Sequence, residues 1–156
     1  MVLFLADAEA TEAFGARLYR AMVPEVVIYL EGQLGTGKTT LVRGFLQEAG
    51  VSGRIKSPTY TLVETYVTPS MKVAHFDLYR LQDPEELEWI GFRDYLQKES
   101  VCFVEWPEKG RGFLPPADLI IRIECQDQGR RIELKAESER GQAILEQLKT
   151  LIKAMN

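Results

Sequence analysis

The chain has 156 residues, of which 46% are hydrophobic and 27% are charged, and its 23 acidic and 19 basic side chains give a net charge of −4. This length and composition predict one globular domain over residues 1–156, and the lack of a basic excess argues against a dedicated nucleic-acid-binding protein, although it leaves room for a local basic patch. No apolar run approaches the roughly 20 residues of a membrane-spanning helix, and the N-terminus lacks the basic start of a signal peptide, so we expect a cytoplasmic protein with no membrane contact.

The first third of the chain predicts two helices around a buried strand. Asp7 can cap a helix over residues 8–22, whose apolar face is formed by side chains at four-residue spacing, namely Phe14, Leu18 and Met22. Residues 26–30 (VVIYL) show no polar alternation and therefore predict a buried strand. Helical periodicity returns over residues 39–49, and Gly50 can end that helix.

The middle of the chain predicts a hairpin, a helix start and a further strand. Residues 60–67 and 72–77 look like strands, and the Thr-Pro-Ser segment between them suggests a hairpin, so the sheet is expected to be mixed. The run Asp-Pro-Glu-Glu at 83–86 combines a cap, a proline in the first helical position and acidic residues in the first turn. A short buried strand is expected at 101–104.

The last part of the chain predicts a second hairpin and a closing helix. Residues 119–125 and 131–136 are strand-like and are separated by a polar turn, and residues 143–154 form an amphipathic helical pattern. Cys102 and Cys125 both lie in apolar, strand-like runs, so we expect two buried free thiols rather than a disulfide or a metal site.

The clearest signal is the sequence GQLGTGKTT at residues 32–40, directly after the first predicted strand and before the second predicted helix. It contains the phosphate-binding pattern G-x-x-x-x-G-K-[ST] in full and in the context that the pattern requires. Glycine lets the backbone curl so that several N–H groups point at one anion, and the following helix presents its positive end to the same anion. The alternative is a glycine-rich turn that merely precedes a helix. The expected nucleotide-binding residues here are Gly32, Gln33, Leu34, Gly35, Thr36, Gly37, Lys38, Thr39 and Thr40.

Within this segment, Lys38 brings a full positive charge to the β- and γ-phosphates, and the Thr39 hydroxyl is suited to bind Mg²⁺. The motif predicts a nucleoside triphosphate site without saying which reaction takes place there. The predicted fold class is α/β: a three-layer P-loop NTPase-like fold with a mixed, mostly parallel central sheet and a C-terminal β-hairpin plus helix.

Two acidic residues follow apolar runs, at the ends of predicted strands. Asp77 ends the run VAHFD and Glu105 ends the run VCFVE. Ligands bind at the carboxyl ends of strands in open α/β sheets, and a P-loop enzyme needs an acid for its metal and a polar group to orient the nucleophile. Asp77 and Glu105 are therefore predicted to be catalytic and, with Thr39, to bind the metal. The alternative is that each acid caps a helix or pairs with a surface lysine.

Three further side chains are candidates for supporting roles. Thr59, in the segment KSPTY, lies between the P-loop helix and the next strand, where nucleotide switches place a segment that responds to the γ-phosphate and Mg²⁺. An ordinary Ser-Pro turn is the alternative. His75 is the only histidine and cannot form a zinc site alone, so a packed or supporting role is favoured. Trp106 either packs against the rim of the site or belongs to the core.

The segments GQLGTGKTT, SPTYTLVETY, HFDLYRL and VEWPE together resemble, in their order and spacing, the TsaE (formerly YjeE) family, which are small bacterial P-loop ATPases of tRNA threonylcarbamoyladenosine biosynthesis. The resemblance extends from the N-terminal helix to the hairpin past residue 120, and HFDLYRL and EWPE are more specific to the family than the phosphate loop. The family usually has Asp where Gln33 stands and often Ala where Thr36 stands. Both are variable positions of the loop, so nucleotide binding is expected to survive.

The resemblance implies ATP or ADP with Mg²⁺, and weak hydrolysis by the isolated protein. It implies the TsaB–TsaD heterodimer as the working partner, in which TsaD transfers the threonylcarbamoyl group, so that tRNA is met only through that complex. By matching positions, Lys38 and Thr39 would bind phosphate and metal, Asp77 would assist Mg²⁺, and Glu105 with Trp106 would support hydrolysis.

Two other functions are compatible with a phosphate loop. A small-molecule kinase would need a mobile lid with arginines, for which Gly110-Arg111-Gly112 and Arg130-Arg131 are candidates, although surface loops carry such charges in any case. A GTPase-type switch would need an Asn-Lys-x-Asp segment to recognise guanine, and the sequence contains none.

Overall fold

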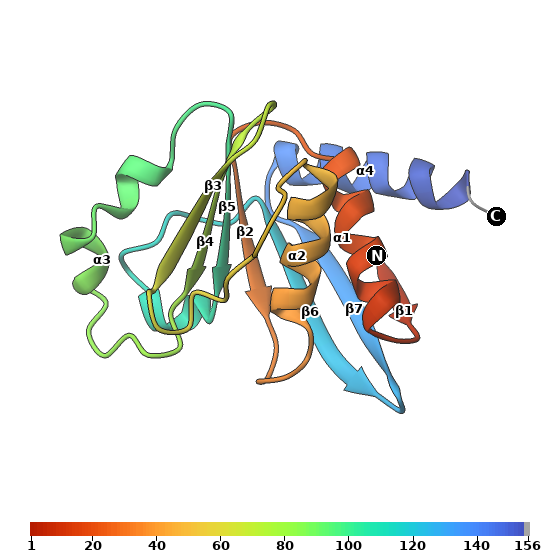
Figure 1. The fold of residues 1–156 in the computed structure, drawn as a ribbon, viewed down its shortest axis with the longest axis horizontal. Helices are drawn as coiled ribbons and strands as arrows, with labels where there is room; N and C mark the ends of the chain where they lie inside the picture. Colours follow the sequence, from red (N-terminus) through yellow and green to blue (C-terminus); the bar gives the residue numbers. More distant parts are fainter. Residues whose placement is uncertain (155–156) are drawn as a thin grey trace.

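The computed structural model describes residues 1–154 (Figure 1). The elements follow one another in the order β1 (Val2–Leu5), α1 (Ala8–Arg20), β2 (Val26–Glu31), α2 (Lys38–Glu48), β3 (Val63–Val67), β4 (Lys72–Asp77), α3 (Glu86–Trp89), η1 (Phe92–Tyr95), β5 (Ser100–Glu105), η2 (Pro107–Gly110), β6 (Leu119–Gln126), β7 (Gly129–Ala136) and α4 (Glu139–Lys153). The two η elements are short 3₁₀ helices.

The strands of the described chain form one seven-stranded sheet in the order β1-β7-β6-β2-β5-β4-β3. The central strands β6, β2, β5 and β4 run parallel to one another, and β1, β7 and β3 pair antiparallel at the two sides. The sheet is therefore mixed, as predicted, with its parallel strands in the centre. The carboxyl ends of β2, β4 and β5 consequently meet at one edge, the lower edge in Figure 1.

The two faces of the sheet bury different sets of side chains, because neighbouring residues of a strand point to opposite faces. On β2, Val26, Ile28 and Leu30 belong to the core under α1, α2 and α4. Val27, between them, belongs to a second core with residues of α3 and η1. Figure 1 shows α1, α2 and α4 on one side of the sheet and α3 on the other, which confirms the predicted three-layer arrangement.

Helices α1 and α2 approach each other closely at two glycines. A Cβ atom on Gly44 of α2 would lie 2.0 Å from the carbonyl oxygen of Glu12, and one on Gly15 of α1 would lie 2.1 Å from that of Leu41. Only hydrogen fits at these positions, so the backbones are in contact. This contact packs α2, the helix that follows the phosphate loop, directly against α1.

Several element boundaries differ from the predictions. The apolar N-terminus forms β1, which was not predicted and which pairs with β7 at the edge of the described sheet. The first helix ends at Arg20 rather than at residue 22, so that Met22 lies beyond it. The strand predicted to begin at residue 60 begins at Val63, because Leu62 has a φ of 73° and donates its N–H to the Pro58 carbonyl in a turn.

The second half differs in three respects. The signal at 83–86 leads only to the one-turn helix α3, which begins at Glu86. Strands β6 and β7 are longer than predicted, so that only two turn residues lie between them. Helix α4 begins four residues earlier than predicted, because the Ser138 side chain accepts a hydrogen bond from the Gly141 N–H and caps it.

The cysteines differ in their surroundings. Cys102 on β5 is fully buried, as predicted, and burial raises the pKa of its thiol to about 12. The prediction was wrong for Cys125, which is exposed near the end of β6. Both thiols are free.

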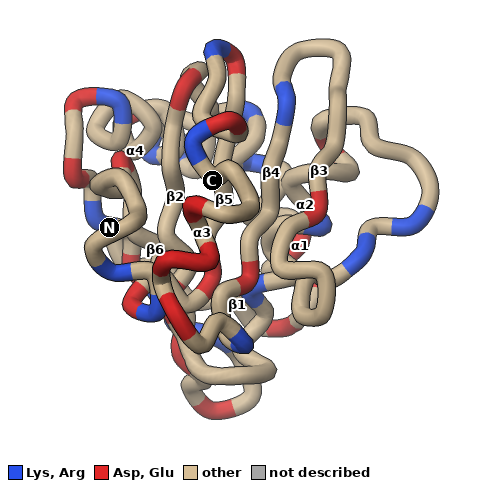
Figure 2. The backbone as a smooth tube through the Cα atoms, turned by 90° about the vertical axis from the view of Figure 1, so that its left-hand side faces the viewer, with Lys and Arg blue, Asp and Glu red and all other residues tan. Residues whose placement is uncertain are grey.

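Two further observations concern the helices of the described chain and the placement of its charged residues. Among residues 1–154, no helix combines the length and the apolar character needed to traverse a bilayer. On the α3 side, acidic segments gather around α3 and basic segments are scattered among the others (Figure 2).

The contact between α1 and α2 can be tested with Gly44→Ala. Helix propensity alone would make this change stabilising by about 1 kcal/mol. The clash with the Glu12 carbonyl should reverse the sign and cost about 1–3 kcal/mol or more, measured by chemical denaturation. Gln47→Ala, on an exposed position of the same helix, is the control, and a stabilised Gly44→Ala variant would contradict the close approach.

Candidate nucleotide-binding site

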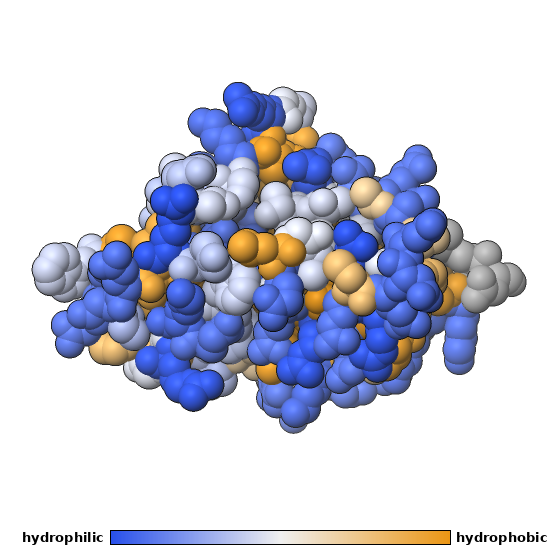
Figure 3. Space-filling model, turned by 90° about the horizontal axis from the view of Figure 1, so that it is seen from below, coloured by the Kyte–Doolittle hydropathy of each residue, from blue (hydrophilic) through white to orange (hydrophobic). Residues whose placement is uncertain are grey.

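The phosphate loop connects β2 to α2 at the carboxyl edge of the sheet, on the end of the molecule seen in Figure 3. This end is mainly hydrophilic, with hydrophobic and intermediate side chains near its middle. Gly35 and Gly37 have φ angles of 78° and 107°, which explains why glycine stands at both positions. A cavity of about 310 Å³ opens here, lined by Asp7, Ala8, Thr11, Leu34, Gly35, Thr36, Gly37, Lys38, Thr39, Thr40, Thr59, Asp77, Glu105, Trp106, Gln128 and Arg130.

The start of α2 is suited to bind an anion. Helices α1 and α4 are capped by the side chains of Asp7 and Ser138, whereas Gly37 at the start of α2 gives no side-chain cap. The first N–H groups of α2 are therefore left for a ligand of the cavity, and the positive end of the helix dipole favours a negative one.

Lys38 places a buried ammonium group at the same end of the cavity. Its side chain is 4% exposed, and its Nζ donates a hydrogen bond to the Gly32 carbonyl. The Nζ lies 4.0 Å from Glu105 Oε1 and 4.2 Å from the centre of the Trp106 ring. Burial lowers the pKa of Lys38, and the negative charges of Glu105 and Asp77 oppose that shift.

Asp77 and Glu105 lie side by side, as predicted from their positions at strand ends. They are directly opposite each other in the parallel pairing of β4 with β5, and both are almost fully buried. The Glu105 carboxylate contacts Lys38, Thr39 and His75, and the Asp77 carboxylate accepts hydrogen bonds from the Tyr79 N–H and the Thr59 hydroxyl. These partners are not those of the alternative, in which each acid would pair with a surface lysine or cap a helix.

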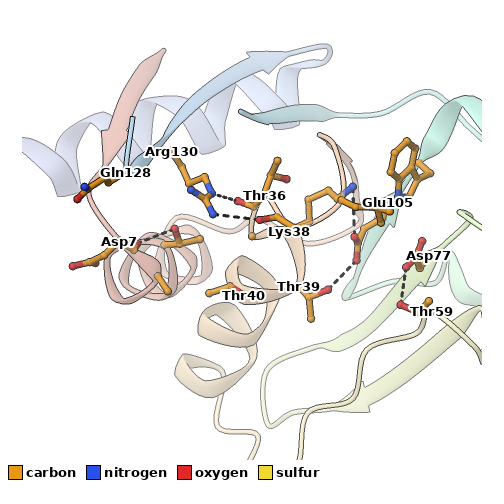
Figure 4. A pocket seen from close by; sticks show the side chains of 16 residues that line it. Asp7, Thr36, Lys38, Thr39, Thr40, Thr59, Asp77, Glu105, Gln128 and Arg130 are labelled. Atoms are coloured by element: carbon orange, nitrogen blue, oxygen red, sulfur yellow. Dashed lines mark hydrogen bonds and ion pairs between the residues drawn. The ribbon is translucent and has the colours of Figure 1, made fainter. Parts of the chain in front are cut away.

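The side chains of Thr39, Glu105 and Asp77 have the chemistry of a magnesium site. Thr39 Oγ1 lies 3.5 Å from Glu105 Oε2, and Asp77 lies beside them in the close-up (Figure 4). Burial raises the pKa of Asp77, and the neighbouring charge of Glu105 raises it further, against the effect of its two hydrogen-bond donors. Mg²⁺ prefers oxygen ligands and keeps several from water and phosphate, so one hydroxyl and two carboxylates fit it.

Thr59 and Trp106 both line the cavity. Thr59 donates to Asp77 Oδ2 over 3.2 Å and so connects the loop before β3 to the carboxylates, which an independent Ser-Pro turn would not do. Trp106 packs at the rim between Lys38 and Tyr79, with 5.1 Å between the two aromatic ring centres. Its φ of 56° is unusual for a bulky residue and turns the chain sharply at the end of β5.

Two residues of the predicted set lie outside this cavity. Gly32 and Gln33 line a second cavity, together with Arg122 and Glu124 of β6. Gly32 still takes part in the site through its carbonyl, which accepts from Lys38.

The structure adds residues from both ends of the chain that the motifs did not indicate. The start of α1 contributes Asp7, Ala8 and Thr11, and the β6–β7 hairpin contributes Gln128 and Arg130. The Asp7 signal indicated only a helix cap, and Arg130 had been considered only for a mobile lid. Their places depend on the packing of α1 against α2 and on the hairpin register, neither of which a local motif encodes.

Arg130 is bound to the backbone of the phosphate loop. Its Nε donates to the Thr36 carbonyl over 2.8 Å, and its Nη2 donates to the Gly35 carbonyl over 3.3 Å. In a trans peptide the C=O and the N–H point in opposite directions. The Gly35 and Thr36 carbonyls share their peptide units with the N–H groups of Thr36 and Gly37. Because the guanidinium binds these two carbonyls, the two N–H groups point away from Arg130.

Comparison with known proteins identifies relatives that cover most of the chain. The family model described as "Threonylcarbamoyl adenosine biosynthesis protein TsaE" matches residues 5–132. The chain is 53% identical over 120 residues to the tRNA threonylcarbamoyladenosine biosynthesis protein TsaE of Haemophilus influenzae, covering 77% of this chain and 76% of the relative. It is 34% identical over 141 residues to the protein of the same name from Bacillus subtilis, covering 90% and 88%.

A solved structure shares the fold. The crystal structure of YdiB from Bacillus subtilis superposes with a TM-score of 0.79 at 30% identity, over 96% of this chain and 94% of that one. The arrangement of the sheet and helices is therefore that of an experimentally determined protein with similar sequence.

The raised pKa of Asp77 predicts a stability effect with a definite sign. A carboxyl that binds its proton more tightly in the folded state weakens the fold once it ionises, as the pH rises through its elevated pKa. Asp77→Asn, which cannot ionise, should therefore melt at the same or a higher temperature than the parent protein near neutral pH without nucleotide. This advantage should shrink as the pH falls below the elevated pKa.

The matched control for that measurement is Asp83→Asn. Asp83 is exposed and accepts a hydrogen bond from the N–H two residues ahead, as Asp77 does. A marked loss of stability in Asp77→Asn but not in Asp83→Asn at neutral pH would show that the ionised Asp77 stabilises the fold, contrary to this account.

Proposed function

The chain belongs to the TsaE family and thus to tRNA threonylcarbamoyladenosine biosynthesis, and on that premise we propose that it is a Mg²⁺-dependent ATPase that acts on a TsaB–TsaD complex. One observation carries the proposal: Lys38, Thr39, Asp77 and Glu105 converge on a single cavity at the start of an uncapped helix. This set combines an anion site with oxygen ligands for a divalent cation, which is the combination that a nucleoside triphosphate with its metal requires.

Each residue has a proposed part in the reaction. The N–H groups of Gly35 to Gly37 and the Lys38 ammonium hold the phosphates, and the Thr39 hydroxyl and the two carboxylates hold the metal. Magnesium, when bound, neutralises charge that develops on the phosphates. Glu105 is the residue proposed to accept a proton from the attacking water, because it lies beside Lys38 and Thr39, which are proposed to bind the phosphates and the metal. Trp106 covers the lysine and keeps water from it.

Slow hydrolysis by the isolated protein is consistent with the surroundings of Glu105. A general base must be free to reach the nucleophile, but both carboxylate oxygens of Glu105 face protein groups: Lys38 lies near Oε1, and His75 and Thr39 contact Oε2. A partner that changes these contacts would raise the rate. We propose the TsaB–TsaD complex for this part, a cytoplasmic location, and contact with tRNA only through the complex.

The kinase alternative loses one of its two candidate lids, Arg130-Arg131, whereas Arg111 of the other candidate is exposed. Of the arginines considered for a mobile lid, Arg130 is bound to the phosphate loop and Arg131 pairs with Glu133 over 3.1 Å. Residues held in this way are part of the scaffold of the site rather than of a lid.

Phosphate release tests the proposal. Glu105→Gln should bind ATP with nearly the affinity of the parent protein but hydrolyse it at least about 100-fold more slowly when TsaB–TsaD and tRNA are present, because the base is lost. Lys38→Ala should lose ATP affinity in calorimetry. Glu108→Gln, an exposed carboxyl nearby, is the control. A normal rate in Glu105→Gln would remove Glu105 from the mechanism, and phosphate transfer to a small acceptor would favour a kinase.

The role of Arg130 gives a second prediction. Arg130→Lys keeps the charge but cannot supply the two-pronged contact to the Gly35 and Thr36 carbonyls. It should weaken ATP binding about tenfold, equivalent to roughly 1.4 kcal/mol, in calorimetry. Arg131→Lys is the control at the adjacent position. If Arg130→Lys binds ATP normally while Arg130→Ala does not, the charge of Arg130 rather than its hold on the loop is what matters.

A further inference from the structure

His75 is a buried polar residue whose role the proposed reaction does not explain. It lies on β4 two residues before Asp77, and its side chain is fully buried. Its Nε2 lies 2.6 Å from Glu105 Oε2, whereas its Nδ1 is buried with no hydrogen-bond partner among the described residues. The imidazole ring therefore makes one strong polar contact, and that contact is to the proposed base.

The chemistry of the partner determines which nitrogen carries the proton. A carboxylate in its ionised form only accepts hydrogen bonds, and in that form of Glu105 the donor of this contact is His75 Nε2. In the Nε2–H form of the neutral ring, Nδ1 is a bare acceptor and has no hydrogen-bond partner among the described residues. Only one of the two ring nitrogens is needed at this position.

Packing alone does not call for a histidine. His75 lies opposite Phe103 of β5 in the sheet, and Val73 occupies the position two residues earlier on the same face, both within the hydrophobic core. A leucine or methionine would fill such a position without leaving a buried nitrogen unsatisfied. The polar group is therefore best explained by the residue that it contacts.

The contact divides the two oxygens of Glu105 between different neighbours. His75 and Thr39 lie against Oε2, at 2.6 Å and 3.5 Å, and Oε1 is the oxygen near Lys38 at 4.0 Å. A carboxylate held by one oxygen cannot rotate freely about its last bond, so the direction of the other oxygen is fixed as well.

We propose that His75 is a positioning residue, which holds Glu105 by Oε2 so that Oε1 stays directed at the phosphate-binding end of the cavity. This proposal rests on the proposed role of Glu105 in ATP hydrolysis. It assigns no chemical step to the histidine itself, which lies behind the carboxylate and does not line the cavity.

The hydrogen bond can be observed directly, independently of any activity. Because His75 is the only histidine, the imidazole signals of a ¹⁵N-histidine-labelled sample need no assignment. We expect the Nε2–H form in the full-length protein, and a change of the Nε2 chemical shift in Glu105→Gln but not in Glu108→Gln. An Nδ1–H form, or an Nε2 signal that ignores Glu105→Gln, would overturn the proposal.

Variants separate positioning from simple packing. His75→Leu should keep ATP affinity within about threefold and reduce the partner-stimulated rate at least tenfold. The amide N–H of glutamine reaches about as far as Nε2, so His75→Gln should retain most of the parent rate. A role in packing alone predicts the opposite, because leucine suits the apolar core better than glutamine does. A melting curve of each variant establishes whether it is folded. If His75→Leu does not fold, the imidazole spectrum of the parent protein still tests the proposal.

A double variant completes the test. If His75 acts through Glu105, adding His75→Leu to Glu105→Gln should cause no further loss of rate, whereas two independent effects would multiply. If Glu105→Gln itself hydrolyses ATP normally, the proposed function of Glu105 fails. If Glu105→Gln is impaired while His75→Leu is not, only the positioning role is overturned.

Discussion

The register of three parallel strands is the constraint on which the site depends. Leu30 on β2 is opposite Glu105 on β5, and Glu105 is opposite Asp77 on β4, so the phosphate loop leaves the sheet beside both carboxylates. A shift of one residue would turn Glu105 to the other face of the sheet, among the apolar side chains under α3. The aliphatic residues that set the register therefore also determine whether Lys38 has a carboxylate 4.0 Å away.

Charged side chains are buried at this edge of the sheet, whereas the two cores on the faces of the sheet are apolar. Lys38, Asp77 and Glu105 are almost fully buried, although burial disfavours the charged form of each type of group. The raised pKa of Asp77 and the lowered pKa of Lys38 are two consequences of this conflict. Such an arrangement weakens the protein without a ligand, and the apolar cores on both faces of the sheet offset that cost. Local conflict of this kind is typical of sites that bind charged ligands.

The sequence was informative where function depends on local patterns and uninformative where it depends on distant packing. The phosphate loop, Asp77 and Glu105 each follow a recognisable apolar run, so their places could be predicted. Arg130 could not, because it reaches the loop only through the pairing of β7 with β6 and of β6 with β2. Cys125 was misplaced for a related reason: near the hairpin turn, where β6 extends past its pairing with β2, an apolar run no longer implies a covered face.

The surroundings of Glu105 connect the fold to regulation. In the proposed function, the contacts that orient this carboxylate are the ones that keep it from acting as a base, so orientation and restraint come from the same neighbours. Lys38 is the neighbour that a triphosphate would draw away, since the ammonium then has phosphate oxygens to bind. His75 would remain, because it is buried on the strand and does not line the cavity. In the proposed function, nucleotide binding would thus change the contact at Oε1 and leave Oε2 held by His75.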